Sequence, residues 1–141
     1  MDQYNDMAVA GMSAADIVAR GRVRAESLMT DTVRVTRASG APVTDPETAV
    51  VSHPVVEVYA GPGRVQGRTT ESESVDGVQV YVLTDAVVQL PVSVAPIVDD
   101  EIQVTASRMD EHLVGRIFRV KAAPRKTHAT MTRCEVEEVA A

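Results

Sequence analysis

Valine dominates the apolar part of this sequence: 26 of the 141 residues are Val, against four Leu and four Ile. Because its branched Cβ restricts χ1 and fits a pleated surface better than a helix, this composition predicts a mostly-β chain. The alternation is clearest from Thr32 to Arg37, where Val33 and Val35 share one face and polar residues occupy the other. At this length a single domain is the natural expectation.

One helix is predicted ahead of the strands. Ser13 can cap its first turn while Asp16, three residues on, completes a capping box. The less polar positions then recur at helical spacing: Ile17, Gly21, Ala25 and Leu28. The helix is expected to run to about Met29. A glycine in its middle costs about 1 kcal/mol relative to Ala, so Gly21 indicates close packing at that point.

The remaining strands are predicted to be short and separated by turn residues. They cover residues 55–60, 64–66, 78–84, 86–94, 101–107, 117–122 and 130–139. Gly61-Pro62-Gly63 is expected to end one strand, and Asp85 to begin a turn or bulge. Long loops are expected at 38–54, with a short hairpin around Asp45-Pro46-Glu47, and at 67–77. Short strands at such intervals favour an antiparallel barrel or sandwich over a βαβ arrangement.

These elements divide the chain into three parts. They are a flexible N-terminal segment at 1–12, a helix at 13–29 and a β-domain at 31–139. No stretch is long and apolar enough to span a membrane, and the first ten residues lack the basic start of a signal peptide. The sequence therefore indicates a soluble, cytoplasmic protein with no membrane partner.

The net charge argues against a protein whose main task is to bind DNA. The chain has 14 basic and 20 acidic residues, a formal charge of −6, and only one Phe, three Tyr and no Trp. It therefore lacks the basic stripe and stacking rings of nucleic-acid binders. Its charges also form blocks, with a basic segment at 108–133 and an acidic one at 134–141. Such blocks either build two differently charged surfaces or are interleaved by folding.

No arrangement of residues predicts catalysis, a metal site or a cofactor. The three histidines lie far apart, without the spacing of metal ligands: His53, His112 and His128. Ser72 and Ser74 lie among glutamates and outside any Gly-x-Ser-x-Gly elbow. Cys134, the single cysteine, cannot form an internal disulfide and is expected to be a small core residue. We therefore expect that the protein is not an enzyme.

Five segments, taken in order, carry a resemblance to a known family: Arg24 to Asp31, Thr32 to Arg37, Pro42 to Thr48, Val58 to Gln66 and Leu113 to Val120. Together they resemble the small head-to-tail connector proteins of long-tailed phages and prophages of high-GC, actinobacterial hosts. Within that set, the most similar group is the head-to-tail stopper, also called the head-closure protein. The resemblance covers residues 13–139 and rests on turn and strand signatures.

The resemblance implies a small antiparallel β-barrel that assembles as a ring, of twelve copies or alternatively six, at the neck of the virion. The ring would assemble in the host cytoplasm. It would lie beneath the portal and adaptor ring, close the DNA-filled head and offer a platform to the tail terminator. Duplex DNA would pass through its lumen without specific recognition.

Two groups of residues follow from this role. A channel through which DNA slides should avoid basic side chains, because every phosphate paired by Lys or Arg adds affinity for the DNA. An acidic loop therefore suits such a channel. The loop at 67–77 is therefore either a channel gate or an ordinary solvated loop, and the candidate gating residues are Thr69, Thr70, Glu71, Ser72, Glu73, Ser74 and Asp76. The candidate contacts between subunits are Arg20, Arg22, Arg24, Arg125 and Lys126. A solvated helix face is the alternative for the three helix arginines.

Other functions fit the same sequence. One alternative within the same connector is the head-to-tail adaptor, although adaptors tend to be richer in helix than this chain. Another is the tail terminator. From another class, it is alternatively a stand-alone β-barrel binding module or a small enzyme. The genes that neighbour its own would distinguish these classes.

Overall fold

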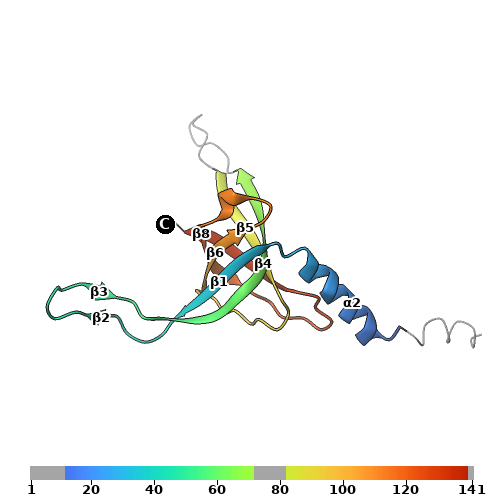
Figure 1. Cartoon of the computed structure of the whole chain (residues 1–141), viewed down its shortest axis with the longest axis horizontal. Helices are drawn as coiled ribbons and strands as arrows, with labels where there is room; N and C mark the ends of the chain where they lie inside the picture. The colour runs from blue at the N-terminus through green and yellow to red at the C-terminus, as the bar shows by residue number, and fades with distance from the viewer. Residues whose placement is uncertain (1–11, 72–81, 140–141) are drawn as a thin grey trace, which may run out of the picture.

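The six long strands of this chain close into an antiparallel barrel. The computed structural model describes residues 12–71 and 82–139. The barrel strands are β1 (Asp31–Ala38), β4 (Val55–Glu71), β5 (Val82–Leu90), β6 (Glu101–Ser107), β7 (Ile117–Ala122) and β8 (Thr132–Val139). Their order around the barrel is β1-β4-β5-β8-β7-β6, and β6 pairs with β1 to close it. The predicted mostly-β barrel, preceded by one helix, is confirmed (Figure 1).

The alternation along each strand fills the barrel with valine. Val33 and Val35 of β1 are fully buried, while the alternating residues Thr32 and Arg34 face solvent, as predicted. Phe118 is the largest side chain of the core. The other core residues are Ala86, Val88, Leu90, Val94, Ile102, Val104, Val120, Cys134 and Val136. Such short, stiff side chains suit a narrow barrel, in which every strand contributes inward-facing residues at alternate positions.

The prediction that Gly61-Pro62-Gly63 ends a strand is wrong. β4 runs without interruption through this segment, pairing with β1 up to Gly63 and with β5 from Arg64 onward. A Cβ at Gly63 would lie 3.0 Å from Val33 Cγ2 and 3.3 Å from Leu90 Cδ2. The glycine therefore marks a place where the strand passes close over the core as it changes partners, rather than a chain reversal.

Two further boundaries differ from expectation. Asp85 lies inside β5, paired with Arg68 and Glu137, and begins no turn. The loop predicted at 67–77 is shorter on its N-terminal side, because β4 continues to Glu71 and pairs with β5. The strand predicted from residue 78 begins, within the described part of the chain, at Val82. In both places cross-strand pairing extends through polar residues that carry no strand signal of their own.

Helix α2 (Ala14–Ser27) begins as predicted and packs only part of its surface. Ser13 and Asp16 form the expected capping box. A Cβ at Gly21 would lie 2.6 Å from Thr130 Cγ2, which confirms the close packing at that glycine. Ile17, by contrast, is 55% exposed, although it belongs to the expected apolar face. The helix therefore rests on the segment before β8 near its middle, while much of its surface faces solvent.

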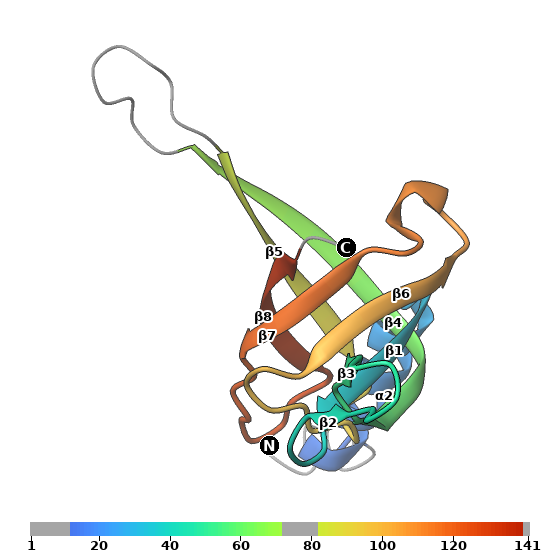
Figure 2. The ribbon, with the colours of Figure 1, turned by 90° about the vertical axis from the view of Figure 1, so that its left-hand side faces the viewer.

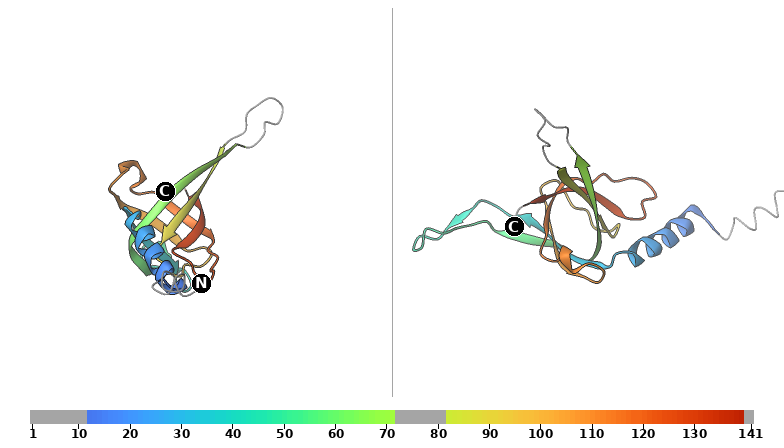
Figure 3. Two further views of the ribbon diagram at one scale, coloured as in Figure 1. Left: turned by 90° about the vertical axis from the view of Figure 1, so that its right-hand side faces the viewer. Right: turned by 90° about the horizontal axis from the view of Figure 1, so that it is seen from above.

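A two-stranded arm leaves the barrel between β1 and β4. It comprises residues 39–54 and contains β2 (Val43–Thr44) and β3 (Val51–Ser52), which confirms the hairpin predicted around Asp45-Pro46-Glu47. The backbone amide of Ser39 donates to the carbonyl of Pro54 over 2.9 Å at its base. The arm and α2 leave the barrel on opposite sides, as two perpendicular views show (Figures 1 and 3).

The barrel end beneath the arm is held by an ion pair whose carboxylate is buried. Asp100 is 1% exposed, and its two carboxylate oxygens accept from Nε and Nη2 of Arg37 over 2.9 and 2.8 Å. These bonds raise the pKa of the Arg37 guanidinium. Asp100 also accepts from the backbone amide of Ile97. Because Arg37 lies near the end of β1, this cluster fixes the point from which the arm emerges. Figure 2 views the molecule from the side on which the arm, with β2 and β3, leaves the barrel.

Candidate functional site

The arm presents apolar side chains to solvent. Every residue from 40 to 53 is exposed. Among them are Val43, Val50 and Val51, and exposed valines continue at Val55 and Val56, where the arm joins β4. Val43 pairs with Ser52 while Val51 pairs with Thr44, so the two strands place a valine on each face of the arm. Several exposed apolar residues gathered in one projecting segment are typical of interaction surfaces.

The turn at the end of the arm is ordered and acidic. The Asp45 carboxylate accepts from the backbone amide of Glu47 over 2.8 Å, and this bond lowers the pKa of Asp45. The amide of Ala49 donates to the Asp45 carbonyl, and Ala49 adopts a φ of +57° to close the turn. The end of the arm therefore presents two acidic side chains, Asp45 and Glu47. No lysine or arginine occurs between Arg37 and Arg64 in the sequence to offset them.

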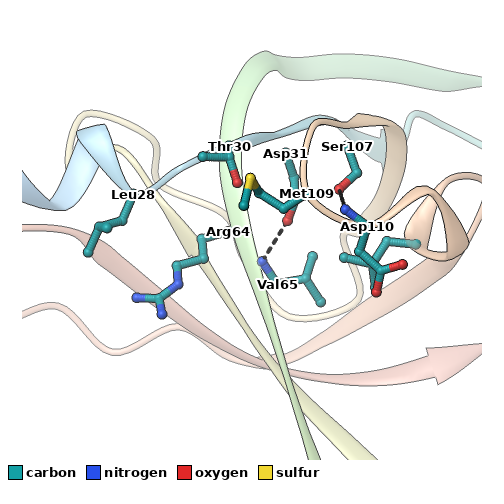
Figure 4. A pocket seen from close by; sticks show the side chains of 9 residues that line it. Leu28, Thr30, Asp31, Arg64, Val65, Ser107, Met109 and Asp110 are labelled. Atoms are coloured by element: carbon teal, nitrogen blue, oxygen red, sulfur yellow. Dashed lines mark hydrogen bonds between the residues drawn. The ribbon is translucent and has the colours of Figure 1, made fainter.

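A depression of about 410 Å³ lies at the other end of β1, beside the C-terminal end of α2. Its apolar lining comes from Leu28, Val65, Met109 and Leu113. The polar lining comes from Thr30, Asp31, Arg64, Ser107 and Asp110. Figure 4 shows Leu28 and Arg64 toward the helix and Ser107 and Asp110 toward the loop after β6.

The carboxylates of this depression have partners within the chain. Asp31 is 5% exposed and accepts from the backbone amide of Val65 over 3.1 Å and from the Ser107 hydroxyl over 2.5 Å. Asp110 accepts from the backbone amide of His112 over 3.0 Å, at the start of the short helix η1 (Glu111–Leu113). Arg64 forms no ion pair with a described residue. The depression therefore combines apolar side chains with two carboxylates and with a cation that has no ion-pair partner among the described residues.

The three helix arginines have different surroundings. Arg22 donates from Nε to the carbonyl of Ala129 over 3.2 Å, so it helps to seat the helix on the barrel. Arg20 makes only a 3.9 Å contact to the sulfur of Met12. Arg24 is exposed, and none of the three pairs with an acid among residues 12–71 and 82–139. Arg20 and Arg24 thus remain candidates for contacts between subunits.

The guanidinium of Arg125 forms its hydrogen bonds within its own subunit. Its guanidinium donates to the carbonyl oxygens of Val92 and Val94 over 2.9 and 3.1 Å, and to the Thr132 hydroxyl over 2.6 Å. These bonds tie the segment after β5 to the first residue of β8. Lys126 is exposed, and no hydrogen bond or ion pair of its side chain occurs with the described residues. Arg125 and Lys126 were predicted together as contacts between subunits, but within the subunit Arg125 is hydrogen-bonded and Lys126 is exposed.

We expect Arg125→Ala to lower the free energy of unfolding by about 2 kcal/mol, because three hydrogen bonds of a charged donor are lost. Lys126→Ala, the matched control, should change it by less than about 0.5 kcal/mol. Urea unfolding followed by circular dichroism measures both variants. Equal stability of the two variants would contradict the structural role of Arg125.

The predicted gating residues are only partly described. Thr69, Thr70 and Glu71 belong to β4 and pair with Thr84, Leu83 and Val82 of β5. Ser72, Glu73, Ser74 and Asp76 lie outside the described residues, as does the N-terminal segment 1–11. The prediction that this loop gates a channel therefore stays a prediction.

The basic and acidic blocks of the sequence do not form separate surfaces. β7 and β8 are adjacent antiparallel strands, and Arg119 lies opposite Glu137 with 3.9 Å between Nη1 and Oε1. Arg116 similarly approaches Glu138 to 3.4 Å. Folding therefore interleaves the charges of these two strands, which was one of the two outcomes expected.

Candidate metal ligands and the single thiol can be located in the described residues. Residues 12–71 and 82–139 include no group of three or more His, Cys, Asp or Glu side chains placed to hold a metal ion. Burial raises the pKa of the Cys134 thiol to about 12, which makes it a poor nucleophile. No helix in the described part of the chain is both long and apolar enough to cross a membrane. The features that remain are the arm and the depression.

Sequence reasoning missed the depression, because its lining comes from the end of α2, β1, β4 and the loop after β6. No local pattern in the sequence brings these segments together. The valines of the arm did carry a signal, since they lie in a segment too interrupted by Pro and Gly for a central strand. Apolar residues in such a segment have no core to enter.

Comparison with known proteins identifies one family. Residues 21–137 match the profile of a family of unknown function, DUF6093. No curated protein and no solved structure matches the chain.

Proposed function

Since the chain belongs to DUF6093, a family whose function is unknown, we propose a function from its sequence and structure: it is a structural protein of the phage neck, a head-to-tail stopper. Copies of it form a ring that closes the DNA-filled head and joins the head to the tail. The observation that carries this proposal is a closed barrel with an arm of exposed valines on one side and helix α2 on the opposite side. The segments that resemble head-to-tail connector proteins supply the biological setting.

The closed barrel restricts how copies can associate. Each barrel strand has a hydrogen-bonded neighbour on both sides, which limits the edges to which a strand of another subunit could add. β4 is less fully covered, because it pairs with β1 only up to Gly63 and with β5 only from Arg64. We therefore expect association to use mainly side chains and projections. Surfaces that differ and lie on opposite sides of one subunit make head-to-tail contacts, and these close into a ring when the rotation between copies allows it. This geometry supports a ring rather than a two-fold dimer.

The share of helix supports the stopper over the adaptor of the same connector. Among the described residues, α2 is the only α-helix, and its 14 residues precede the barrel. Adaptors of the family that the sequence resembles tend to be richer in helix. The buried, protonated thiol and the lack of a metal-binding cluster in the described residues give no support to the small-enzyme alternative.

The test is to locate the protein in purified particles of the phage or prophage that carries its gene. We expect mass spectrometry to detect it and antibody labelling in electron micrographs to place it at the neck. Deletion of the gene should leave filled heads that lack tails and lose DNA, and a plasmid copy should restore joined particles. Its absence from particles, or a deletion strain that assembles joined particles, would contradict the proposed function.

A further inference from the structure

We propose that the arm of one subunit docks in the depression of the next copy of the same chain. This inference rests on the proposed ring, because it names the contact that joins neighbours within it. The arm is residues 39–54, and the depression is the hollow lined by Leu28, Arg64 and Met109 beside the end of α2.

A subunit cannot fill its own depression with its own arm. Asp31, the first residue of β1, lines the depression, whereas the arm begins after Ala38, the last residue of the same strand. At about 3.3 Å per residue, these two points are roughly 23 Å apart along the strand. The arm then extends away from the barrel on the side opposite α2 (Figure 1). The arm therefore reaches only a different molecule.

The two surfaces match in their apolar content. Val50 and Val51 near the end of the arm are 60% and 51% exposed. In the depression Leu28 is 50% exposed and Met109 is 80% exposed. Both partners thus leave large apolar side chains in water within one subunit, and docking would bury them together. Met109 is also unbranched and flexible, a side chain that adapts readily to an incoming surface.

The acidic turn of the arm has a charge partner on one side of the depression. Asp45 and Glu47 make the end of the arm acidic. The depression holds Arg64, and Arg24 precedes Leu28 by one helical turn on α2. The acids of the depression lie elsewhere in it: Asp31 is 5% exposed, and Asp110 lies toward the loop after β6, whereas Arg64 lies toward the helix (Figure 4). The helix side of the depression therefore offers Arg64 as the charge partner for the acidic turn of a neighbour's arm.

A symmetric arm-to-arm contact fits less well. It would bring two acidic turns together, each with Asp45 and Glu47, and repulsion between like charges disfavours that arrangement. It would also leave the depression uncovered. A head-to-tail contact covers both surfaces of every subunit once the ring has closed.

Disulfide trapping tests the contact. The double variant Val51→Cys with Met109→Cys places one thiol on the arm and one in the depression. Native Cys134 contributes little background, because it is fully buried and its pKa is about 12. Mild oxidation of purified particles should then give a ladder of linked subunits. We expect linkage about ten-fold above that of the control pair Val51→Cys with Glu135→Cys, since Glu135 is exposed on β8, three strands from β1 around the barrel.

Each result decides something different. If the chain is in the particles but the Val51–Met109 pair links no better than the control, the docking inference is wrong and the neck function stands. Efficient dimers from Val51→Cys alone would establish an arm-to-arm contact and overturn the inference. If the chain is absent from particles, the neck function is wrong. Oxidation of the concentrated, purified double variant then decides the docking: a ladder supports it and monomers overturn it.

Discussion

Shortening the arm should abolish the joining of heads to tails while the barrel stays folded. Replacing residues 40–53 by Asn-Gly would connect Ser39 to Pro54, whose backbone groups already pair at the base of the arm. Because every neighbour-to-neighbour contact in a ring is lost at once, we expect the titre of infectious particles to fall by about 100-fold or more. Complementation of a deletion strain with the shortened gene measures this effect.

The stability of the barrel serves as the internal control for this variant. All the residues removed are exposed, so the free energy of unfolding should change by less than about 1 kcal/mol. A milder comparison uses Val51→Ser, which should reduce joining, against Val98→Ser, an equally exposed valine outside the arm and the depression. Normal joining by a folded, armless protein would show that the arm has no part in assembly.

Gly63→Val should destabilise the barrel by about 3 kcal/mol, the upper part of the range for overpacked cores. Its Cβ alone would lie 3.0 Å from Val33 Cγ2 and 3.3 Å from Leu90 Cδ2. Both neighbours are fully buried. For a domain of this size, the melting temperature should fall by roughly 10 °C, as measured by calorimetry.

The matched control is Gly67→Val on the same strand. A Cβ at Gly67 meets no atom within 4 Å, and valine suits an extended backbone. Its stability should therefore be equal to the native value or higher. If both glycine variants lost the same stability, the cost would come from the backbone of β4 rather than from the contacts of Gly63.

The regular parts of the fold were predictable because their signals are local. Val33 and Val35 alternate with polar residues, and β1 extends only one residue beyond each end of the predicted strand. β6 and β7 have the bounds expected from their alternation. Ser13 and Asp16 identify the start of α2 through side chains three positions apart. Each of these signals lies within a few residues of the element that it specifies.

The incorrect or missing predictions involve contacts between distant segments. Gly63 looks like a turn residue in sequence, but Val33 and Leu90 explain it in the fold. Arg125 looks like a free surface cation, yet its partners lie about thirty residues earlier in the chain. The depression depends on four separate segments and has no local signature. The candidate docking site could therefore be found only after the chain was folded.

The position of β1 determines how load would pass through an assembled ring. Tension between neighbours would enter a subunit at the arm and leave it at the depression, so it would run lengthwise along β1. β4 and β6 flank that strand along both edges, and the Arg37–Asp100 pair fastens its far end. Pulling along the strand stresses many ladder hydrogen bonds together instead of opening them one by one. A ring connected in this way would resist the outward pressure of packaged DNA without any covalent link between its subunits.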